Sequence, residues 1–370
     1  MKLIIVSVTN DLTTDQRVDK VCNTLSEMGF KVLLIGRKFK NSENLNRNYN
    51  TFRFKLLFNH GFLFYAEYNL RLFFKLFFTK KNILLSNDLD TLLPNFLISK
   101  IFKSKLVYDS HELFTEVPEL NNRPFIKKFW LTLEKNILPH IKNCYTVNSE
   151  IAQIYTTKYN IPVNVIRNLA PKYYKKVHLE SFAEKIKGAK KMLILQGAGI
   201  NVDRGAEEAV EAMQYIENCI LYIIGSGDVI GTLKNKIKDL NIEEKVFILP
   251  KMPYLELMKY TQIADLGLSL DKNTNLNYEF SLPNKIFDYI QAGTPLLVSN
   301  RKIIKEIVEN NNIGKVIETH NPKEIATCIS AIFKNKKLYS KWCQNLIKTA
   351  NIYNWENESE HLKNIYNNLK

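Results

Sequence analysis

Residues that can exchange a proton follow a short apolar run at Leu106–Tyr108. The run leads directly into Asp109, His111 and Glu112. A histidine can donate or accept a proton near neutral pH, or it can hydrogen-bond a phosphate or a sugar hydroxyl. His111 could instead be a structural histidine that holds its loop in place. Because open parallel sheets bind ligands at the carboxyl ends of their strands, the position favours a functional role for His111.

A second group of candidate residues surrounds a short predicted helix. Pro283 breaks the chain before a helix that begins near Asn284, and Gly293 is placed to end it. Lys285 and Asp288 lie three residues apart, on one face of this helix. A carboxylate can accept hydrogen bonds from both hydroxyls of a ribose, and a lysine can bind a phosphate. The spacing leaves a simple surface ion pair open as the alternative.

Two glycine-containing turns end neighbouring strands in the second half of the chain. Gly197 and Gly199 follow one predicted strand and precede Arg204, whereas Gly225 and Gly227 follow the next strand. Small residues let the backbone approach a ligand, and the N-terminus of the helix that follows attracts a phosphate. Arg204 adds a fixed positive charge with forked donors. Glycines also serve ordinary turns, so the two turns together carry the prediction.

The loop after the first predicted strand lacks the glycines of a dinucleotide site. It runs from Thr9 to Val18 and contains Asp15 and Arg17. Its composition therefore argues against NAD or FAD. Asp15 is expected to cap the helix that follows. Arg17 would lie at the edge of a ligand cleft and bind an anion, unless it is a solvated surface arginine.

Asp88 and Asp90 form an Asp-x-Asp pair after the apolar run Ile83–Leu85. Such a pair can hold a divalent cation that bridges phosphates. Two carboxylates alone make an incomplete site, so we expect one of them to cap the helix Thr91–Phe102 and predict no metal.

Short apolar runs alternate with amphipathic segments along the chain. The predicted strands are Leu3–Val8, Val32–Ile35, Ile83–Leu85, Leu106–Tyr108, Cys144–Val147, Val163–Ile166, Met192–Leu195, Ile220–Ile224, Val246–Ile248, Leu266–Ser269, Leu296–Val298 and Val316–Ile317. Alternation of strand and helix predicts parallel sheets covered on both faces. The two sets of strands indicate two doubly wound α/β domains with a ligand cleft between them and a boundary near residues 168–171.

Length and composition exclude several classes of protein. With 370 residues, 45% of them hydrophobic, and only 13 Gly and 11 Pro, the chain is neither disordered nor collagen-like. Residues 1–8 read as a buried strand too short for a signal peptide, and no long apolar stretch is free of charge. The 5 cysteines show no paired or metal-type spacing and indicate reduced thiols in the cytosol.

The net charge of +15 is unevenly distributed. Residues 1–172 contain 25 Lys and Arg against 14 Asp and Glu, whereas the remainder contains 27 against 23. A basic first half indicates an anionic partner, which charge alone does not identify as phosphates, a membrane surface or nucleic acid.

The sequence resembles the GT-B-fold glycosyltransferases, specifically the large family-4 group of retaining enzymes that use nucleotide sugars. The resemblance covers essentially the whole chain. The motifs that carry it are Ser281–Tyr289 with Ala292–Pro295, Asn10–Asp11 with Asp15–Val18, Asp88–Leu92, Tyr108–Glu112, Gln196–Gly197 with Arg204–Gly205, and Tyr353–Glu356. The resemblance implies two Rossmann-like domains facing a cleft, with a C-terminal helix that crosses back to the first domain.

The same resemblance implies a role for each domain. Residues 1–170, with a C-terminal helix at about 352–370, would bind the acceptor, and residues 171–351 would bind the donor. The implied catalytic residues are His111, Arg204 and Lys285. The implied donor-binding residues are Gly197, Gly199, Arg204, Gly225, Gly227, Ser281, Leu282, Asn284, Lys285 and Asp288. The implied acceptor-side residues are Asn10, Asp11, Arg17 and Glu112.

Two departures from the family pattern stand out. The family's two glutamates eight residues apart are replaced here by Phe280 and Asp288, with Glu279 one position off. The usual arginine of the first phosphate loop falls on Gly199. Phosphate binding would therefore rest on Arg204 and Lys285.

The resemblance implies sugar transfer from a nucleotide diphosphate sugar, such as a UDP- or GDP-sugar, with retention and without a further cofactor. Front-face attack assisted by the leaving phosphate is expected, because the paired carboxylates of retaining hydrolases are not visible. The expected acceptor is a glycan or a lipid-linked molecule in cell-surface polysaccharide or lipopolysaccharide synthesis. A nucleotide-sugar epimerase of the same fold is an alternative. A nucleic-acid-binding protein would need a reading module, which the sequence lacks, so no nucleic acid is expected.

Residues 52–78 bear on the location of the enzyme. Phe, Tyr and Leu are flanked here by basic residues, namely Arg53, Lys55, Arg71, Lys75, Lys80 and Lys81. Such a segment can lie in a membrane interface. The alternative is a strand and a helix in the core of the first domain. The expected location is cytoplasmic, and the first alternative adds peripheral attachment to an anionic membrane surface.

Overall fold

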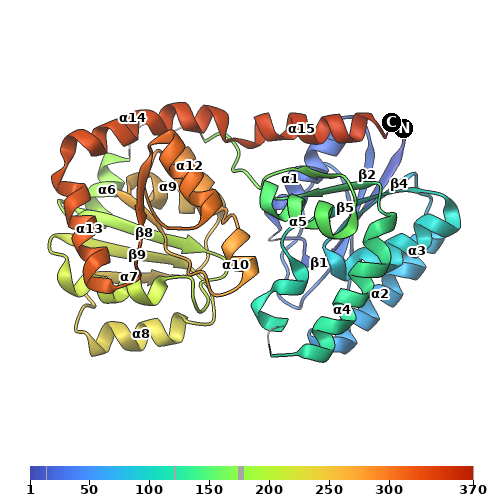
Figure 1. The fold of residues 1–370 in the computed structure, drawn as a ribbon, viewed down its shortest axis with the longest axis horizontal. Helices are drawn as coiled ribbons and strands as arrows, with labels where there is room; N and C mark the ends of the chain where they lie inside the picture. The colour runs from blue at the N-terminus through green and yellow to red at the C-terminus, as the bar shows by residue number, and fades with distance from the viewer. Residues whose placement is uncertain (14, 121, 174–178, 370) are drawn as a thin grey trace. The chain divides into compact units, whose positions relative to one another are not determined.

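The computed structural model describes residues 1–13, 15–120, 122–173 and 179–369, and it divides the chain into two compact units. The first unit comprises Met1–Asn168 and Asn357–Lys370, and the second comprises Leu169–Glu356. These boundaries lie within a few residues of those expected from the sequence. Each unit contains one parallel sheet, so the prediction of two Rossmann-like α/β domains is confirmed (Figure 1).

The first unit is built on a seven-stranded parallel sheet with the order β3-β2-β1-β4-β5-β6-β7. Its strands are β1 Leu3–Asp11, β2 Lys31–Arg37, β3 Asn50–Phe54, β4 Ile83–Asn87, β5 Lys105–Ser110, β6 Asn143–Thr146 and β7 Val163–Val165. The predicted strands omit β3. This edge strand buries only Phe54 fully, so it lacks the continuous apolar run that marks a central strand.

Helices cover both faces of this sheet. They are α1 Gln16–Glu27, α2 Gly61–Phe78, α3 Leu92–Phe102, α4 Pro124–Ile137, α5 Ser149–Tyr159 and α15 Trp355–Asn367, with short 3-10 turns at Leu89–Thr91, Phe114–Glu116, Pro118–Leu120 and Leu138–His140. Right-handed crossovers place α2 to α5 on one face, because the chain advances across the sheet from β3 to β7, and α1 on the other (Figure 1).

The C-terminal helix α15 packs on the first unit, as the family resemblance implies. The ring of Tyr366 meets Phe30 edge-on at 6.3 Å between centroids. The side chain of Glu358 is 2% exposed and accepts hydrogen bonds from the backbone N–H of Arg167 at 2.7 Å and from its guanidinium at 2.7 and 3.0 Å. These contacts hold the end of the chain beside the last strand of the sheet.

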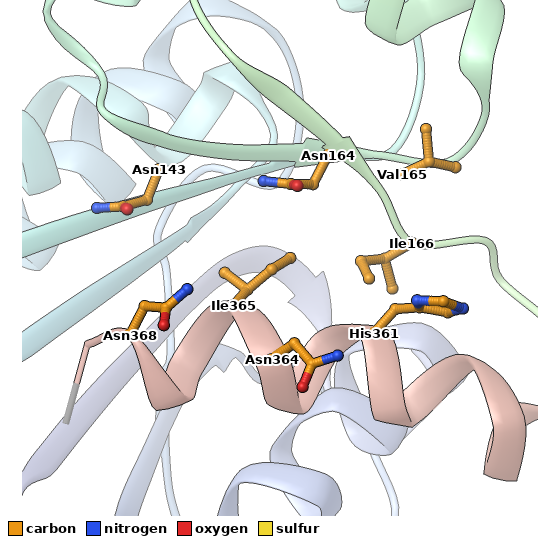
Figure 2. Close-up of a pocket in the computed structure, with 8 residues that line it drawn as sticks. All are labelled: Asn143, Asn164, Val165, Ile166, His361, Asn364, Ile365 and Asn368. Carbon is orange, nitrogen blue, oxygen red and sulfur yellow. The ribbon is translucent and has the colours of Figure 1, made fainter.

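A polar pocket of about 430 Å³ lies between α15 and the last two strands of this sheet (Figure 2). Its lining residues are Asn143, Asn164, Val165, Ile166, His361, Asn364, Ile365 and Asn368. Among these described residues only His361 is ionisable, so the pocket lacks the fixed positive charges that a phosphate requires.

The second unit contains a six-stranded parallel sheet with the order β10-β9-β8-β11-β12-β13. Its strands are β8 Lys191–Gly197, β9 Cys219–Gly225, β10 Val246–Leu249, β11 Leu266–Ser269, β12 Leu296–Ser299 and β13 Gly314–Ile317. Its helices are α6 Glu180–Lys187, α7 Ala206–Ala212, α8 Ile230–Asp239, α9 Tyr254–Ile263, α10 Leu276–Phe280, α11 Lys285–Ala292, α12 Lys302–Asn311, α13 Pro322–Lys334 and α14 Lys336–Ile352, with a 3-10 turn at Met213–Tyr215. One apolar core lies on each face of the sheet.

Two further sequence expectations concern the cysteines and the membrane. All five cysteines are free thiols, and burial raises the pKa of Cys22 well above its usual value, which keeps it protonated and unreactive. Within the described part of the chain, no helix combines the length and apolarity needed to cross a bilayer.

Replacing Glu358 by Ala should lower the free energy of unfolding of the first unit by about 2–3 kcal/mol, because the substitution removes the buried carboxylate that accepts three hydrogen bonds from Arg167. Urea unfolding followed by circular dichroism measures the loss. Glu360 is a control on the same helix, since its side chain is 66% exposed and pairs only with Lys363. Equal stability of the Glu358→Ala and Glu360→Ala variants would contradict a docking role for Glu358.

Candidate active site

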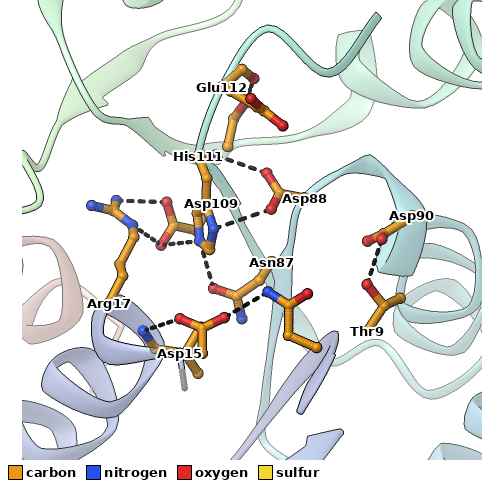
Figure 3. A network of polar contacts seen from close by, with 12 residues as sticks. Thr9, Asp15, Arg17, Asn87, Asp88, Asp90, Asp109, His111 and Glu112 are labelled. Atoms are coloured by element: carbon orange, nitrogen blue, oxygen red, sulfur yellow. Dashed lines mark hydrogen bonds and ion pairs between the residues drawn. The ribbon is translucent and has the colours of Figure 1, made fainter. Parts of the chain in front are cut away.

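The first group of candidate residues gathers at the carboxyl ends of β4 and β5. These strands are paired so that Asn87 lies opposite Asp109, and the backbone N–H of Asp88 donates to the carbonyl of Asp109 at 2.8 Å. The ring of His111 lies between two carboxylates, with Nδ1 3.1 Å from Asp88 and Nε2 3.4 Å from Asp109 (Figure 3). Asn87 Oδ1 is also 3.2 Å from Nε2. The register of two neighbouring strands thus assembles the site.

The two carboxylates keep His111 protonated. Burial by itself lowers the pKa of the ring, but the charges of Asp88 and Asp109 outweigh it and raise the pKa well above the usual value. Both ring nitrogens already face carboxylates as hydrogen-bond donors, which disfavours a role as general base. His111 can instead supply a positive charge beside a ligand, and its side chain remains 18% exposed.

The sequence left two alternatives for Arg17, namely an anion-binding residue at the edge of a cleft and a solvated surface arginine. The side chain is only 4% exposed, so it matches neither. Its guanidinium binds Asp109 through two hydrogen bonds of 2.7 and 3.0 Å and donates a third, of 2.9 Å, to the carbonyl of Ile166. Burial raises the pKa of Asp109, but the positive charges of Arg17 and His111 overcome this effect and lower it. Arg17 therefore orients Asp109, and each of its three guanidinium nitrogens donates a hydrogen bond within the unit.

Three of the residues singled out in the sequence lie at the end of β1 and in the loop that follows it. Asp15 caps α1 by accepting the N–H of Val18 at 3.1 Å, as predicted, and it also accepts a hydrogen bond from Asn10. Asp11 accepts the N–H of Thr13 and lies 3.8 Å from Arg53. Asn10 and Asp11 thus shape the loop, and any contact with an acceptor remains a prediction.

The Asp-x-Asp pair does not cap a helix, contrary to the expectation. Asp88 binds the backbone N–H and ring of His111, and Asp90 accepts a hydrogen bond from Thr9 at 2.6 Å. Burial, and next the charge of Asp88, raise the pKa of Asp90 to about 7. Figure 3 shows Glu112 directed away from this network. Within the described residues, no three His, Cys, Asp or Glu side chains gather as ligands for a metal ion.

The second group of candidate residues surrounds a buried carboxylate in the second unit. Asp271 follows β11, is 0% exposed and pairs with Arg204 at 2.9 Å and with Lys285 at 3.6 Å. A third cation, Arg301, lies 3.5 Å from the same carboxylate and is 1% exposed. Arg204 also lies over the ring of Tyr278, 4.0 Å from its centroid.

Charge does not balance in this cluster, since three cations share one carboxylate. Burial raises the pKa of Asp271, but Lys285, Arg301 and Arg204 overcome it and lower the pKa well below the usual range. Burial lowers the pKa of Lys285, and the charges of Arg204 and Arg301 lower it further. The charge of Asp271 opposes this shift only in part. Glu279 adds a second negative charge that acts on Arg301. An anionic ligand would bring the cluster closer to balance, because buried cations are stable only when they are paired.

Close backbone contacts bring these side chains together. Gly205 has φ +75°, and a Cβ atom there would lie 2.2 Å from the carbonyl oxygen of Leu270. Only glycine allows this approach, which places Arg204 beside Asp271. At Gly225, a Cβ would lie 1.8 Å from the carbonyl oxygen of Gly197, so the two predicted glycine turns pack on each other.

The remaining turn residues follow the same arrangement. The N–H of Ile200, just after Gly199, donates to the carbonyl of Ser226, just before Gly227, at 2.9 Å. This hydrogen bond fixes both loops at the carboxyl edge of the sheet. Whether their glycines face a nucleotide remains a prediction.

Asp288 lies in the first turn of α11, where the sequence places it. Its two carboxylate oxygens accept hydrogen bonds from Gln196 and Tyr254, both at 3.1 Å. These two hydrogen bonds orient the carboxylate at the start of the helix. Gly293 ends this helix with φ +75°, as predicted.

The segment before α11 is tied to Arg301. Ser281 accepts a hydrogen bond of 2.8 Å from the guanidinium, which also donates to the carbonyl of Tyr278. Leu282 packs against the apolar core, and Asn284 is the residue just before the helix. One carboxylate oxygen of Glu279 is buried and has no hydrogen-bond partner among the described residues. Arg301 thus connects this segment to Asp271.

Sequence reasoning missed Asp271, Arg301 and Tyr254. The first two follow the apolar runs Leu266–Ser269 and Leu296–Val298, so the rule that ligands bind at the carboxyl ends of strands could have found them. Tyr254 begins a helix and has no comparable sequence signal.

Two Rossmann-like units, each built on one parallel sheet, define the GT-B fold. Residues 178–349, which lie in the second unit, match the family model of glycosyl transferases group 1. This match agrees with the family resemblance found in the sequence.

Solved structures share the fold over the whole chain. Sucrose-phosphate synthase from Thermosynechococcus elongatus superposes with a TM-score of 0.83 at 15% identity, covering 100% of this chain and 99% of that one. Anabaena HepE in complex with UDP-glucose gives 0.75 at 13% identity and covers 100% of both chains. WaaG, a glycosyltransferase involved in lipopolysaccharide biosynthesis, gives 0.70 at 13% identity over 98% of both chains.

Curated relatives match the sequence over shorter stretches. The chitobiosyldiphosphodolichol beta-mannosyltransferase of Candida albicans is 23% identical over 308 residues, which is 75% of this chain and 66% of that protein. The amylovoran biosynthesis glycosyltransferase AmsK of Erwinia amylovora is 28% identical over 141 residues, 36% of this chain and 35% of that protein. The chain thus spans from about one third to two thirds of the length of these relatives.

His111 should remain protonated well above pH 6.5, roughly the usual pKa of a histidine. Because folding raises this pKa, the charged ring stabilises the first unit fully below about pH 6.5, and the contribution is lost as the pH rises through the folded-state pKa. Asp88→Asn removes one carboxylate and should lower the pKa of His111. An NMR titration of the histidine ring protons, assigned with His111→Gln, measures both values.

The exposed Asp239 of α8 provides the matched control, since Asp239→Asn should leave the His111 titration unchanged. A wild-type His111 that titrates at or below about pH 6.5 would contradict the charged network.

Proposed function

We propose that the chain transfers a sugar from a UDP- or GDP-sugar to a glycan or lipid-linked acceptor, in the synthesis of a cell-surface polysaccharide or lipopolysaccharide. The second unit would bind the donor and the first unit the acceptor. The relatives support this assignment, because one is named for a dolichol-linked substrate, one for amylovoran biosynthesis and one for lipopolysaccharide biosynthesis.

The cluster around Asp271 is the observation that carries the proposal. The diphosphate leaving group gains negative charge as the bond from the anomeric carbon to the phosphate oxygen breaks. Arg204 and Lys285 are both partly accessible, 24% and 10% exposed, and they would stabilise this charge. Arg301 is fully buried and would act as a positioning residue that holds Asp271 and the segment of Ser281.

The nucleoside would be recognised next to this cluster. Asp288, oriented by Gln196 and Tyr254, would accept hydrogen bonds from the ribose hydroxyls. The backbone at Gly225 and Gly227 would contact the nucleotide. Glu279, with one buried unpartnered oxygen, is a candidate contact for the transferred sugar.

His111 would lie beside the transferred sugar as a positively charged group. The proposed reaction is front-face attack, as in the family it resembles. The acceptor oxygen bonds to the anomeric carbon on the face from which the diphosphate departs, and the acceptor proton passes to the leaving phosphate oxygen. In this scheme no side chain of the protein acts as the base, which agrees with the charged state of His111.

A thermal-shift screen with UDP-, GDP-, ADP- and dTDP-sugars tests the donor. A ligand that binds only the folded protein raises its stability, by about 2.7 kcal/mol at a hundred times its Kd. We expect a shift with UDP- or GDP-sugars only. The absence of a shift with every nucleotide sugar would contradict the proposal, and product analysis with donor alone separates transfer from epimerisation.

Arg204→Ala should lower kcat by about 10²- to 10³-fold, because it removes a positive charge that stabilises the leaving diphosphate. Lys285 and Arg301 continue to pair with Asp271, so the fold should be retained. Lys236→Ala, which removes a cation paired with Glu211 on the surface, is the control. Near-normal turnover by Arg204→Ala, measured with the donor identified in the screen, would refute the assignment.

A further inference from the structure

Helix α2 is apolar on two opposite faces. The residues of one stripe are buried against the sheet of the first unit, namely Phe64, Tyr68, Leu72 and Leu76. The residues of the other stripe are exposed by 39% to 60%, namely Leu63, Leu70, Phe74 and Phe77. At 3.6 residues per turn, the two stripes point in roughly opposite directions. Packing within the unit explains the first stripe and leaves the second uncovered.

The neighbouring helix α3 continues this exposed surface. It packs along α2, and the rings of Phe77 and Phe102 meet edge-on at 5.3 Å (Figure 1). Its residues Leu93, Leu97 and Ile101 recur every four positions and are 38% to 55% exposed. A helix whose outer face is exposed to water would carry polar residues at these three positions.

Helix α4 adds a third apolar stripe. It contacts both neighbours, since it packs on α3 and its Trp130 meets Tyr65 of α2 at 5.3 Å. Its residues Phe125, Ile126 and Phe129 are 87%, 41% and 50% exposed. The exposed apolar residues of α2, α3 and α4 together form a surface that we call the α2–α4 face.

The charges around the α2–α4 face are almost all positive. Residues 61–81, 92–103 and 122–137 contain ten Lys and Arg against two Glu. Neither glutamate is open to solvent, because Glu134 is 1% exposed and Glu67, at 12%, binds Arg71 and two backbone N–H groups. The face therefore combines an apolar surface with a mainly cationic rim, in which Lys127 pairs with Glu116 of a neighbouring turn at 2.7 Å.

Lysines at the rim lie along the aromatic rings. The ammonium of Lys81 is 3.6 Å from the ring centroid of Phe102, and that of Lys100 is 5.2 Å from Phe96. Lys81 also donates to the carbonyls of Leu76, Phe77 and Thr79 at the end of α2. Lys100, by contrast, can cover apolar surface with its stem while its charged end reaches outward. This arrangement suits a boundary between a hydrocarbon layer and anionic headgroups.

We propose that the α2–α4 face docks the protein on an anionic lipid bilayer. The Phe, Leu and Ile side chains insert among the acyl chains, and the Lys and Arg side chains bind lipid phosphates. A second copy of the chain is a poorer partner, because two such faces would bring their like charges together. The inference rests on the proposed function only in that a lipid-linked acceptor would lie in the same bilayer.

Flotation with liposomes tests the docking surface directly. The wild-type chain should float with vesicles of phosphatidylcholine and phosphatidylglycerol, and less so when the salt concentration is raised. Phe78→Ser/Phe125→Ser, at positions 80% and 87% exposed, should reduce binding about tenfold or more. Ile347→Ser/Ile352→Ser on α14, at 62% and 58% exposure, is the matched control and should bind as the wild type does.

The rim is tested by removing charge alone. Lys80→Gln/Lys100→Gln/Lys128→Gln should weaken binding to the anionic vesicles and reduce its dependence on salt. Lys234→Gln/Lys238→Gln/Lys341→Gln, at exposed positions of the second unit, is the control. Vesicles of phosphatidylcholine alone should bind the wild type less.

Two outcomes would overturn the inference. The first is a flotation result: either the wild-type chain does not float with the vesicles at low salt, or the Phe78→Ser/Phe125→Ser variant floats as well as the wild type. The other is a dimer, seen by analytical ultracentrifugation, that the same variant dissociates. The thermal shift with nucleotide sugars should be the same in all these variants, so failure of docking and failure of the proposed function are distinguishable.

Discussion

A carboxylate buried at the carboxyl end of a parallel strand organises each of the two candidate sites. Asp109 and Asp271 are both 0% exposed and lie at the carboxyl edges of their sheets. A buried charge is tolerated only where other charges and hydrogen bonds satisfy it, so each carboxylate dictates which side chains surround it. The two sites differ because the surrounding charges add up differently.

Around Asp109 the charges nearly cancel. Arg17 and His111 face Asp109 and Asp88, so the first unit presents an oriented, protonated histidine with little excess charge. Around Asp271 three cations exceed one carboxylate, and the excess field can act on an incoming anion. This difference gives a physical basis for the proposal that donor phosphates bind in one unit and uncharged sugar hydroxyls in the other.

The basic character of the first half of the chain has a separate origin. The cations of its candidate site are paired with carboxylates, so they do not account for the excess charge. Much of the excess lies around α2, α3 and α4, where two glutamates are shielded and the lysines border exposed phenylalanines. Helix α2 has two apolar faces. One packs in the core of its own unit, and the other, as we propose, contacts a lipid surface.

The sequence by itself determined the elements and many of the site residues. Apolar runs marked all but one of the strands, and the missing one, β3, is an edge strand whose alternating burial leaves no such run. Gly293 and Asp15 were assigned from local chemistry, because a left-handed helix end and an N-cap depend on neighbouring residues alone. Arg204, Lys285 and His111 were selected because they follow strands or begin a helix at the edge where ligands bind.

Only the tertiary structure decided how those residues are paired. Arg17 meets Asp109 across 92 positions of the sequence, and Asp271 receives Arg204 from 67 positions before it and Arg301 from 30 positions after it. Strand order and register set such contacts, and neither is encoded in local spacing. For the same reason the second apolar stripe of α2 could be read as core or surface until the packing showed which stripe the sheet buries.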